Sequence, residues 1–496
     1  MLDGLLLFGQ SILRFGAPET IFLALLASLV GVVMGALPGL TATMSLALVT
    51  TLTLKLPPEQ ALLILICTYV GSIYGGSRSA ILLNIPGTPA SAASCLDGYQ
   101  LARQGMAGRA MGIATTGSVM GTLIGMFFLA AFTPVLGGLA LKFGAYEFFW
   151  LALFGVIIAG TLTGDDPLKG WIAGIAGLFI ATIGQEPQYG YERFAWGVRD
   201  LAGGIQLVPA LVGAFGFAEL LTAMRQRQAP VKISAFDTVI PKLRDVTRYW
   251  RTILRSGLIG TGVGIVPGVG EDVAAWSSYA AAKRASPEKA QFGKGSVEGL
   301  MAAETGDNAC VPGAMIPVLT LAIPGSAPAA VLMAAMIIHG VKPGPLIMVE
   351  NPSFVYDVVA MMLFATIGIL IYGLVLTKAL VQVLRVPQHL IVPIIFVLCS
   401  VGSFAIAGRL FDVYVMLAFG LIGFFLRHFG YPMAPLVLGI VLGDLLEKNL
   451  RRALILSDGD LSPFFTRPIS GAVAALIFGT IGFKLYSLHR RRKGAA

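Results

Sequence analysis

A short helix-breaking motif occurs twice in this chain, each time inside an apolar run long enough to enter a membrane. The copies span residues 31–39 and 260–268, fit the pattern G-x-x-x-G-x-x-P-G, and place Pro38 and Pro267 229 residues apart. Proline removes a backbone donor and clashes with the preceding helical turn, and the glycine beside it admits conformations that other residues avoid. Paired broken helices in two halves of a membrane protein point to a transporter's substrate site. The duplication therefore predicts a transporter whose site lies at the two breaks.

The composition is that of a polytopic helical membrane protein. Of 496 residues, 56% are hydrophobic and only 12% are charged, with a mean hydropathy of +0.82; soluble domains carry about 25% charged residues. Apolar runs of roughly 18 residues recur along the chain, as membrane-spanning helices require. We expect an all-α polytopic fold with about 11–14 helices or half-helices entering the membrane. The four cysteines are scattered without a C-x-x-C motif, so no metal or haem site is expected.

The net charge of +9 is concentrated in two segments. Basic residues crowd the stretch from Arg225 to Arg255, and the chain closes with His489-Arg-Arg-Arg-Lys493. By the positive-inside rule, both segments are expected in the cytoplasm. This interpretation is favoured over nucleic-acid binding, so no nucleic-acid partner is expected. The N-terminus lacks a basic n-region and is expected to be a retained first span, not a cleaved signal peptide.

The duplication extends beyond the breaks. The residues Ile85-Pro-Gly-Thr88 return as Ile323-Pro-Gly-Ser326, and further short matches keep the same order. We expect two transmembrane repeats with broken helices and hairpins, inverted if each repeat crosses the membrane an odd number of times. The predicted division is a first repeat at 1–224, a basic cytoplasmic linker at 225–255, a second repeat at 256–448, and a C-terminal span with a basic tail at 449–496.

The residues around the first break are suited to binding an anion. Pro38 and Gly39 are expected to end one helix, and Thr41 and Thr43 then fall in the first turn of a new half-helix. Free N–H groups at a helix start, its positive dipole end and the two hydroxyls attract a carboxylate. These four residues are candidates for substrate binding.

The second break differs because acids follow it. Gly268 and Gly270 are the corresponding substrate-binding candidates, and Glu271 and Asp272 come directly afterwards. Carboxylates suit a helix start but repel an anionic ligand, so they are expected to hold a coupling cation or to face water. The competing interpretation is that both breaks are packing kinks, with G-x-x-x-G as a helix-contact face.

A polar segment rich in glycine and proline lies inside the first repeat. Its candidates for substrate binding are Ser77, Arg78, Asn84, Gly87 and Thr88. Non-helical backbone at membrane depth must be buried in protein or line a cavity. A guanidinium there is a natural carboxylate partner, although an arginine at the interface that snorkels to water is an equal alternative. The polar link that begins at Asp97 is expected to be aqueous.

The second repeat supplies a candidate cation site. Glu304, Asp307 and Asn308 cluster in sequence, close to Gly325 and Ser326, which are further substrate-binding candidates. Carboxylate and amide oxygens in a membrane coordinate Na⁺ or relay H⁺. The alternative is that this acidic segment is a solvated loop.

Several of these motifs resemble one family. They are G-A-L-P-G-L-T at 35–41, Y-G-G-S at 74–77, N-I-P-G-T-P-A-S at 84–91, A-E-T-G-D-N-A at 303–309 and L-G-D-L-L-E-K-N-L-R-R at 442–452. With them, the chain resembles nearly end to end the large membrane subunit of the tripartite tricarboxylate transporters, the TctA family. That family commonly reads Ala-Asn-Asn-Ala where this chain has Gly306-Asp307-Asn308-Ala309, so an acid replaces an amide.

The resemblance implies a secondary importer of di- or tricarboxylates in the bacterial inner membrane. It would work by alternating access in symport with Na⁺ or H⁺, with no other cofactor and no enzymatic activity. Its expected partners are a small transmembrane subunit (TctB-like), a periplasmic solute-binding protein (TctC-like) and membrane lipid. One alternative is a passive carboxylate channel or uniporter. Another is an intramembrane aspartyl protease using Asp357 and Asp444, but Val441 breaks the usual G-x-G-D pattern.

Overall fold

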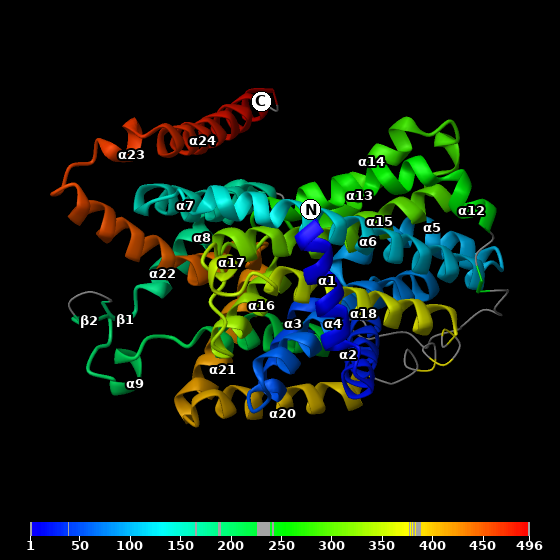
Figure 1. Cartoon of the computed structure of the whole chain (residues 1–496), viewed down its shortest axis with the longest axis horizontal. Coiled ribbons are helices and arrows are strands. Elements are labelled where there is room, and N and C mark those ends of the chain that lie inside the picture. The colour runs from blue at the N-terminus through cyan, green and yellow to red at the C-terminus, as the bar shows by residue number, and fades with distance from the viewer. Residues whose placement is uncertain are drawn as a thin grey trace. The chain divides into compact units, whose positions relative to one another are not determined.

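The computed structural model describes residues 2–37, 39–163, 166–186, 190–225, 239–240, 243–375, 377, 379, 382 and 388–494, which are mostly helical (Figure 1). Seven of its helices are long and apolar enough to cross a membrane, and six shorter apolar helices accompany them. The strands of the described part are β1 (Gly184–Gln185) and β2 (Glu192–Arg193), which pair antiparallel. The predicted all-α polytopic fold is confirmed.

The chain forms two compact units. Unit 1 comprises Met1–Gly137 and Val208–Phe424, and unit 2 comprises Gly138–Leu207 and Phe425–Ala496. The division into repeats proposed from the sequence concerns duplication, not compactness, and its boundaries stay a prediction.

Unit 1 holds both copies of the duplicated motif. Its first part contains α1 (Leu2–Phe15), α2 (Pro18–Ala36), α3 (Ala42–Thr53), α4 (Pro58–Leu83), the 3-10 turn η1 (Pro89–Ser91), α5 (Ala92–Arg103) and most of α6 (Ala107–Ala140). Its second part contains α10 (Leu207–Leu211), the π-helix η2 (Val212–Phe217), α11 (Ala218–Arg225), α12 (Leu243–Arg248), α13 (Trp250–Ile265), α14 (Gly270–Ala285), η3 (Lys289–Gln291), α15 (Val297–Leu321), α16 (Ala327–Ile338), α17 (Ile347–Glu350), α18 (Phe354–Leu374), α20 (Gln388–Ala407) and most of α21 (Leu410–His428).

Each break turns a helix pair into a hairpin. Gly39 and Gly268 have φ angles of 94° and 71°, a region that favours glycine, and they are equivalent positions of the motif. After the second break, α14 runs back beside α13, so that Thr252 near the start of α13 and Ser286 after the end of α14 both donate to Glu298, each at 2.6 Å. The two ends of this hairpin therefore lie together at one end of unit 1.

Two equivalent helix pairs, α2 with α4 and α13 with α15, pack in the same way. A Cβ on Gly35 of α2 would overlap the backbone of Ser72 on α4, and a Cβ on Gly264 of α13 would overlap the backbone of Cys310 on α15. The G-x-x-x-G glycines therefore let α2 approach α4 closely, and α13 approach α15. The two contacts involve equivalent positions of the duplicated motif. In Figure 1, α13, α14 and α15 lie side by side.

The equivalent helices α4 and α15 run antiparallel. Tyr69 interacts with Cys310, and Ser77 and Arg78 further along α4 interact with Glu304. Still further along, Ile81 packs in one cluster with Leu300. Residue numbers thus rise along α4 as they fall along the adjacent α15, so the two halves of unit 1 are inverted relative to each other, as the parity argument expected.

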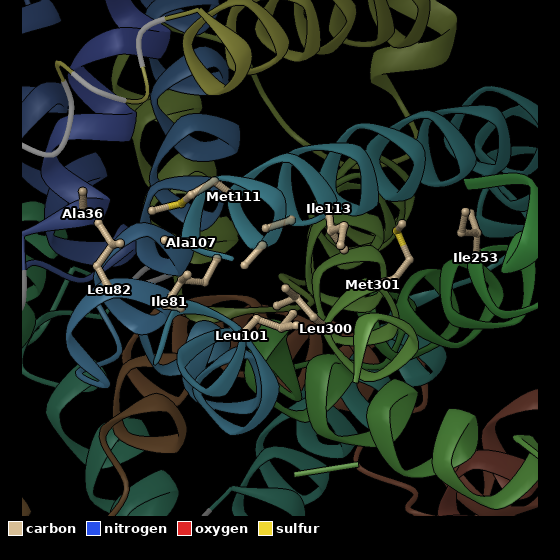
Figure 2. Packing of buried hydrophobic residues seen from close by; sticks show 13 residues of the cluster. Ala36, Ile81, Leu82, Leu101, Ala107, Met111, Ile113, Ile253, Leu300 and Met301 are labelled. Atoms are coloured by element: carbon tan, nitrogen blue, oxygen red, sulfur yellow. The ribbon is translucent and has the colours of Figure 1, made fainter. Parts of the chain in front are cut away.

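A hydrophobic cluster joins both halves at the end of unit 1 that carries Glu298. Figure 2 shows Leu101 of α5 beside Leu300 of α15, with Ile81 of α4 and Ala107 of α6 nearby. Alanines, leucines, isoleucines and methionines from α2, α4, α5, α6, α13 and α15 close this end around one apolar core. The polar site begins one to two turns further along α4 and α15.

Unit 2 is a separate helical body. It is built from α7 (Ala145–Leu162), α8 (Pro167–Ala181), α9 (Arg199–Ala202), α22 (Met433–Leu456), α23 (Pro463–Thr466) and α24 (Pro468–Gly494). Gly160 and Gly170 bring α7 against α8, and Gly177 brings α8 against α22. Trp150 of α7 donates to the Phe464 carbonyl of α23 at 2.8 Å.

Candidate functional site

A buried layer of polar side chains follows the interface between α4 and α15. It starts at the second hairpin tip and continues toward the hydrophobic cluster of Figure 2. Its members are Tyr69, Arg78, Glu271, Glu304, Asp307, Asn308 and Ser326, all between 0% and 5% exposed. We call this set the polar layer.

At the hairpin tip, a tyrosine of the first half binds a carboxylate of the second. The Tyr69 hydroxyl donates to Glu271 in the first turn of α14 and lies 2.7 Å from the hydroxyl of Ser326. Ser326 also caps α16 by accepting from the Ala329 N–H at 3.3 Å. A buried carboxylate is thereby supplied with a donor at a helix start, where the backbone dipole favours negative charge.

Glu304 lies within α15 and is fully buried. The hydroxyl of Ser94 on α5 donates to one carboxylate oxygen at 2.5 Å, and that of Ser118 on α6 donates to the other at 3.0 Å. The solvated-loop interpretation of this segment is therefore wrong, since α15 runs unbroken from Val297 to Leu321.

Arg78 is 1% exposed and stacks on the ring of Tyr74, with 4.4 Å from the guanidinium carbon to the ring centroid. Its Nη2 donates to the Ser77 hydroxyl at 3.2 Å, while Nε and Nη1 have no hydrogen-bond partner among the described residues. The guanidinium also interacts with the charge of Glu304. The snorkelling alternative is therefore wrong, because the side chain is enclosed by protein.

Asp307 and Asn308 form the centre of the layer. The Asn308 amide donates to Asp307 Oδ1 at 2.8 Å and to the Glu304 carbonyl at 3.1 Å. Asp307 Oδ2 and Asn308 Oδ1 have no donor within the described part of the chain. Asp307 interacts with the charges of both Glu304 and Glu271, so these three buried carboxylates belong to one electrostatic site.

The charges of this site do not balance within the layer. The layer holds three buried carboxylates and one guanidinium, that of Arg78, which interacts with Glu304. Burying unpaired carboxylates in a membrane protein is costly, and carboxylates sharing one site disfavour joint ionisation. The arrangement is thus suited to taking up protons or monovalent cations.

The structure places the residues predicted at the first break at the start of α3 and in the turn before it. Thr41 is the N-cap of α3 and accepts from the Met44 N–H at 3.2 Å, and Thr43 is buried in the first turn. Gly39 provides the turn between the helices. Pro38 lies outside the described residues.

The remaining glycines predicted as site residues shape the backbone of the site. Gly268 donates its N–H to the Pro324 carbonyl at 3.2 Å, and Gly270 begins α14 with a φ of 83°. Cβ atoms on Gly87 and Gly325 would overlap the carbonyls of Gly35 and Gly264, so each I-P-G segment seats on its own hairpin.

Asn84 and Thr88, which flank the first I-P-G segment, differ in burial. Asn84 ends α4 in the left-handed conformation with a φ of 57°, and its side chain is exposed. Thr88 is 2% exposed, and its hydroxyl has no hydrogen-bond partner in the described structure. Thr88 is therefore enclosed by protein while Asn84 faces outward, and the role of each in substrate binding stays a prediction.

The polar link that was expected to be aqueous begins with a buried residue: Asp97 is fully buried in α5, while residues 103–105 further along are exposed. One carboxylate oxygen accepts from the N–H groups of Gly293, Gly295 and Ser296 at 2.8, 2.9 and 2.7 Å. The other accepts from the Tyr279 hydroxyl at 2.8 Å. These partners lie almost 200 residues further along the chain, so the local sequence gave no sign of them.

Sequence reasoning also missed Tyr69, Ser94 and Ser118 as site residues. Tyr69 had a usable signal, because the offset of 238 residues that relates Pro86 to Pro324 also places Tyr69 opposite Asp307. Ser94 and Ser118 resemble the many other small hydroxyls of these helices. No group of three His, Cys, Asp or Glu side chains in the described ranges is arranged to hold a metal ion.

An all-helical membrane protein with inverted hairpin repeats and a buried charged site at the helix breaks has the architecture of a transporter. The chain belongs to the tripartite tricarboxylate transporter TctA family, whose model matches residues 21–438. It is a multi-pass membrane protein of a transporter family.

Two relatives come from Agrobacterium vitis. The chain is 35% identical over 460 residues to an uncharacterised 52.8 kDa protein in the TAR-I ttuC' 3' region, covering 92% of both chains. It is 36% identical over 217 residues, 44% of this chain and 90% of the relative, to an uncharacterised protein in the TAR-II ttuC' 3' region. No solved structure matches the chain.

Proposed function

We propose that this chain is the large permease subunit of a binding-protein-dependent symporter that imports di- or tricarboxylates across the bacterial inner membrane. The basic segment that includes α12, together with the C-terminal tail, is assigned to the cytoplasm by the positive-inside rule. A small transmembrane subunit and a periplasmic solute-binding protein complete the transporter, and the binding protein selects the carboxylate. The chain itself catalyses no covalent chemistry in this proposal.

The observation that carries the proposal is the charge arrangement of the polar layer. A carboxylate substrate needs a cationic partner, and the two unpartnered nitrogens of the buried Arg78 offer one. The three neighbouring carboxylates repel such a substrate unless cations or protons neutralise them. Substrate and cation therefore stabilise each other's binding, which is the thermodynamic requirement for symport.

The inverted halves provide a route to alternating access. The second hairpin tip meets the polar layer through Glu271, which accepts a hydrogen bond from Tyr69 on α4 of the other half. A rocking or sliding movement of one element past the other exposes such a site to each side in turn. The coupling ion is Na⁺ or H⁺, held by Glu304, Asp307 and Asn308.

Uptake into proteoliposomes tests this function. The vesicles contain this chain and a small transmembrane subunit, and labelled citrate or succinate is added with or without the binding protein. We expect uptake that needs the binding protein and follows an imposed Na⁺ or pH gradient. Flux that needs neither would identify the alternative, a passive channel or uniporter.

A further inference from the structure

The two halves of unit 1 differ at one pair of equivalent positions. The offset that relates Gly39 to Gly268 also relates Ala42 to Glu271. The offset that relates Pro86 to Pro324 also relates Thr88 to Ser326 and Tyr69 to Asp307. Ala42, Thr88 and Asp307 are therefore the positions of the duplication that correspond to Glu271, Ser326 and Tyr69, the three residues joined at the second hairpin tip.

The second half supplies a complete set. We call Tyr69, Glu271 and Ser326 the second half-site. Here the Glu271 carboxylate, 5% exposed, receives the Tyr69 hydroxyl, and the Ser326 hydroxyl lies 2.7 Å from that phenol oxygen. A carboxylate thus already fills this position, and it comes from the chain.

The first half has equivalent residues, but it has no acid at the position that corresponds to Glu271. We call Ala42, Thr88 and Asp307 the first half-site. Ala42 is 3% exposed and offers only a methyl group, while the Thr88 hydroxyl and Asp307 Oδ2 are buried and have no hydrogen-bond partner among the described residues. The helices around it correspond as well, since α16 packs on α3 as η1 and α5 pack on α14.

We propose that the first half-site binds one carboxylate group of the substrate, in the position that corresponds to the Glu271 carboxylate in the second half-site. The Thr88 hydroxyl donates to this group, and the methyl of Ala42 leaves room for it. This inference rests on the proposed function and specifies where that function's substrate binds. The second half-site then shows the geometry of the bound state with an internal carboxylate.

Because Asp307 stands in the first half-site at the position that Tyr69 occupies in the second, substrate binding in the first half-site requires a cation. In the second half-site a phenol donates a hydrogen bond to the carboxylate. In the first half-site the corresponding group is a carboxylate, which repels the substrate's carboxylate unless a proton or a monovalent cation lies between them. The Asn308 Oδ1 atom is a further oxygen ligand available there. Substrate and cation therefore bind as a pair.

Supplying the missing acid tests the proposal. The variant Ala42→Glu places the chain's own carboxylate where the substrate's belongs, and Glu271 shows that this fold tolerates the residue at the equivalent position. The control Ala42→Gln has the same size without the charge. Citrate and succinate binding to the purified full chain is measured by calorimetry, in Na⁺ and in choline buffers at two pH values.

We expect Ala42→Glu to bind citrate at least tenfold more weakly than Ala42→Gln, a difference of about 1.4 kcal/mol. Equal affinities in the two variants would overturn the proposal. The buffer series distinguishes a shared proton, seen as a pH dependence alone, from a shared Na⁺. Wild-type chain that neither binds nor transports a carboxylate would instead overturn the proposed function, and this inference with it.

A second pair of variants keeps the test decisive if the position-42 variants do not fold. Thr88→Ser keeps the hydroxyl, as Ser326 does in the other half, and Thr88→Val removes it at similar size. Because Thr88→Val loses a hydrogen bond to a charged group, it is expected to weaken citrate binding at least tenfold relative to Thr88→Ser. Equal binding by these two variants would contradict the assignment of Thr88.

Discussion

The Tyr69 hydroxyl in the first half of unit 1 donates to the Glu271 carboxylate in the second half, across 202 residues of sequence. This bond joins the long helix α4 to the tip of the opposite hairpin. It holds a buried acid at a helix break. The acid and its donor come from the two inverted halves, so the site depends on both halves.

Removing that acid should leave a binding position for an added carboxylate. Glu271→Ala removes the carboxylate that accepts from the Tyr69 hydroxyl, which is expected to lower the free energy of unfolding by about 1–3 kcal/mol. Acetate should raise the melting temperature of this variant more than that of the wild type, as measured by thermal unfolding in detergent. Equal responses to acetate would show that the position does not accept a carboxylate.

Arg78 should be needed for uptake and not for folding. Arg78→Gln removes the only charge of this side chain, and Arg78→Lys replaces a planar fork by a single ammonium. We expect citrate uptake to fall more than tenfold in Arg78→Gln and to a smaller extent in Arg78→Lys. The control is Arg248→Gln, which breaks an exposed ion pair with Glu288. If Arg78→Gln transports as well as this control, Arg78 is not a substrate ligand.

Asp307 should set the cation dependence of substrate binding. In Asp307→Asn the amide has no charge to neutralise, so one fewer cation or proton is required. The slope of log Kd for citrate against log cation concentration should fall by about one, by thermodynamic linkage. An unchanged slope for both Na⁺ and H⁺ would remove Asp307 from the coupling site.

The glycines at the two breaks should not tolerate substitution, because their backbone conformation disfavours other residues. Gly39 and Gly268 have φ angles in the left-handed region, where an L side chain costs about 1–2 kcal/mol. We expect Gly39→Leu and Gly268→Leu to abolish uptake while the protein still inserts in the membrane. Gly262→Leu on α13 is the control, since its Cβ would meet no atom within 4 Å. Normal uptake by both break variants would separate the breaks from the site.

Asp97 should act on stability, since it ties α5 to the chain before α15. Asp97→Ala leaves three buried N–H groups without their acceptor, at an expected cost of about 3 kcal/mol or more. The control Asp444→Ala removes an exposed ion pair with Lys448, which contributes about 0–1 kcal/mol. Similar melting temperatures for the two variants would show that the Asp97 contacts contribute little.

The sequence was informative where a residue's own chemistry determines local structure. Proline and glycine at 267–268 interrupt any helix that contains them, so the duplicated breaks and the hairpins were predictable. The repeated I-P-G segments likewise predicted equivalent seats on the two hairpins. The inversion of the halves followed only weakly, since it depended on the parity of helices whose ends the sequence does not define.

Long-range pairing decided what could not be predicted. Whether Arg78 snorkels or is buried depends on the helices that surround it, and the fate of Asp97 depends on N–H groups almost 200 residues away. Asn84 was expected near the substrate because it precedes the I-P-G segment, yet it ends a helix with its side chain exposed. Glu271 accepts from Tyr69, which lies in an apolar run of the sequence. Nothing near Tyr69 in the sequence marked it as the partner of a buried acid.

The most direct test of coupled carboxylate import is simultaneous measurement of labelled citrate and cation fluxes in proteoliposomes that contain the complete transporter. We expect at least one Na⁺ or H⁺ to move with each citrate, and citrate to accumulate above its external concentration when a gradient of that ion is imposed. Citrate that only equilibrates across the membrane, with no accompanying cation flux, would contradict it.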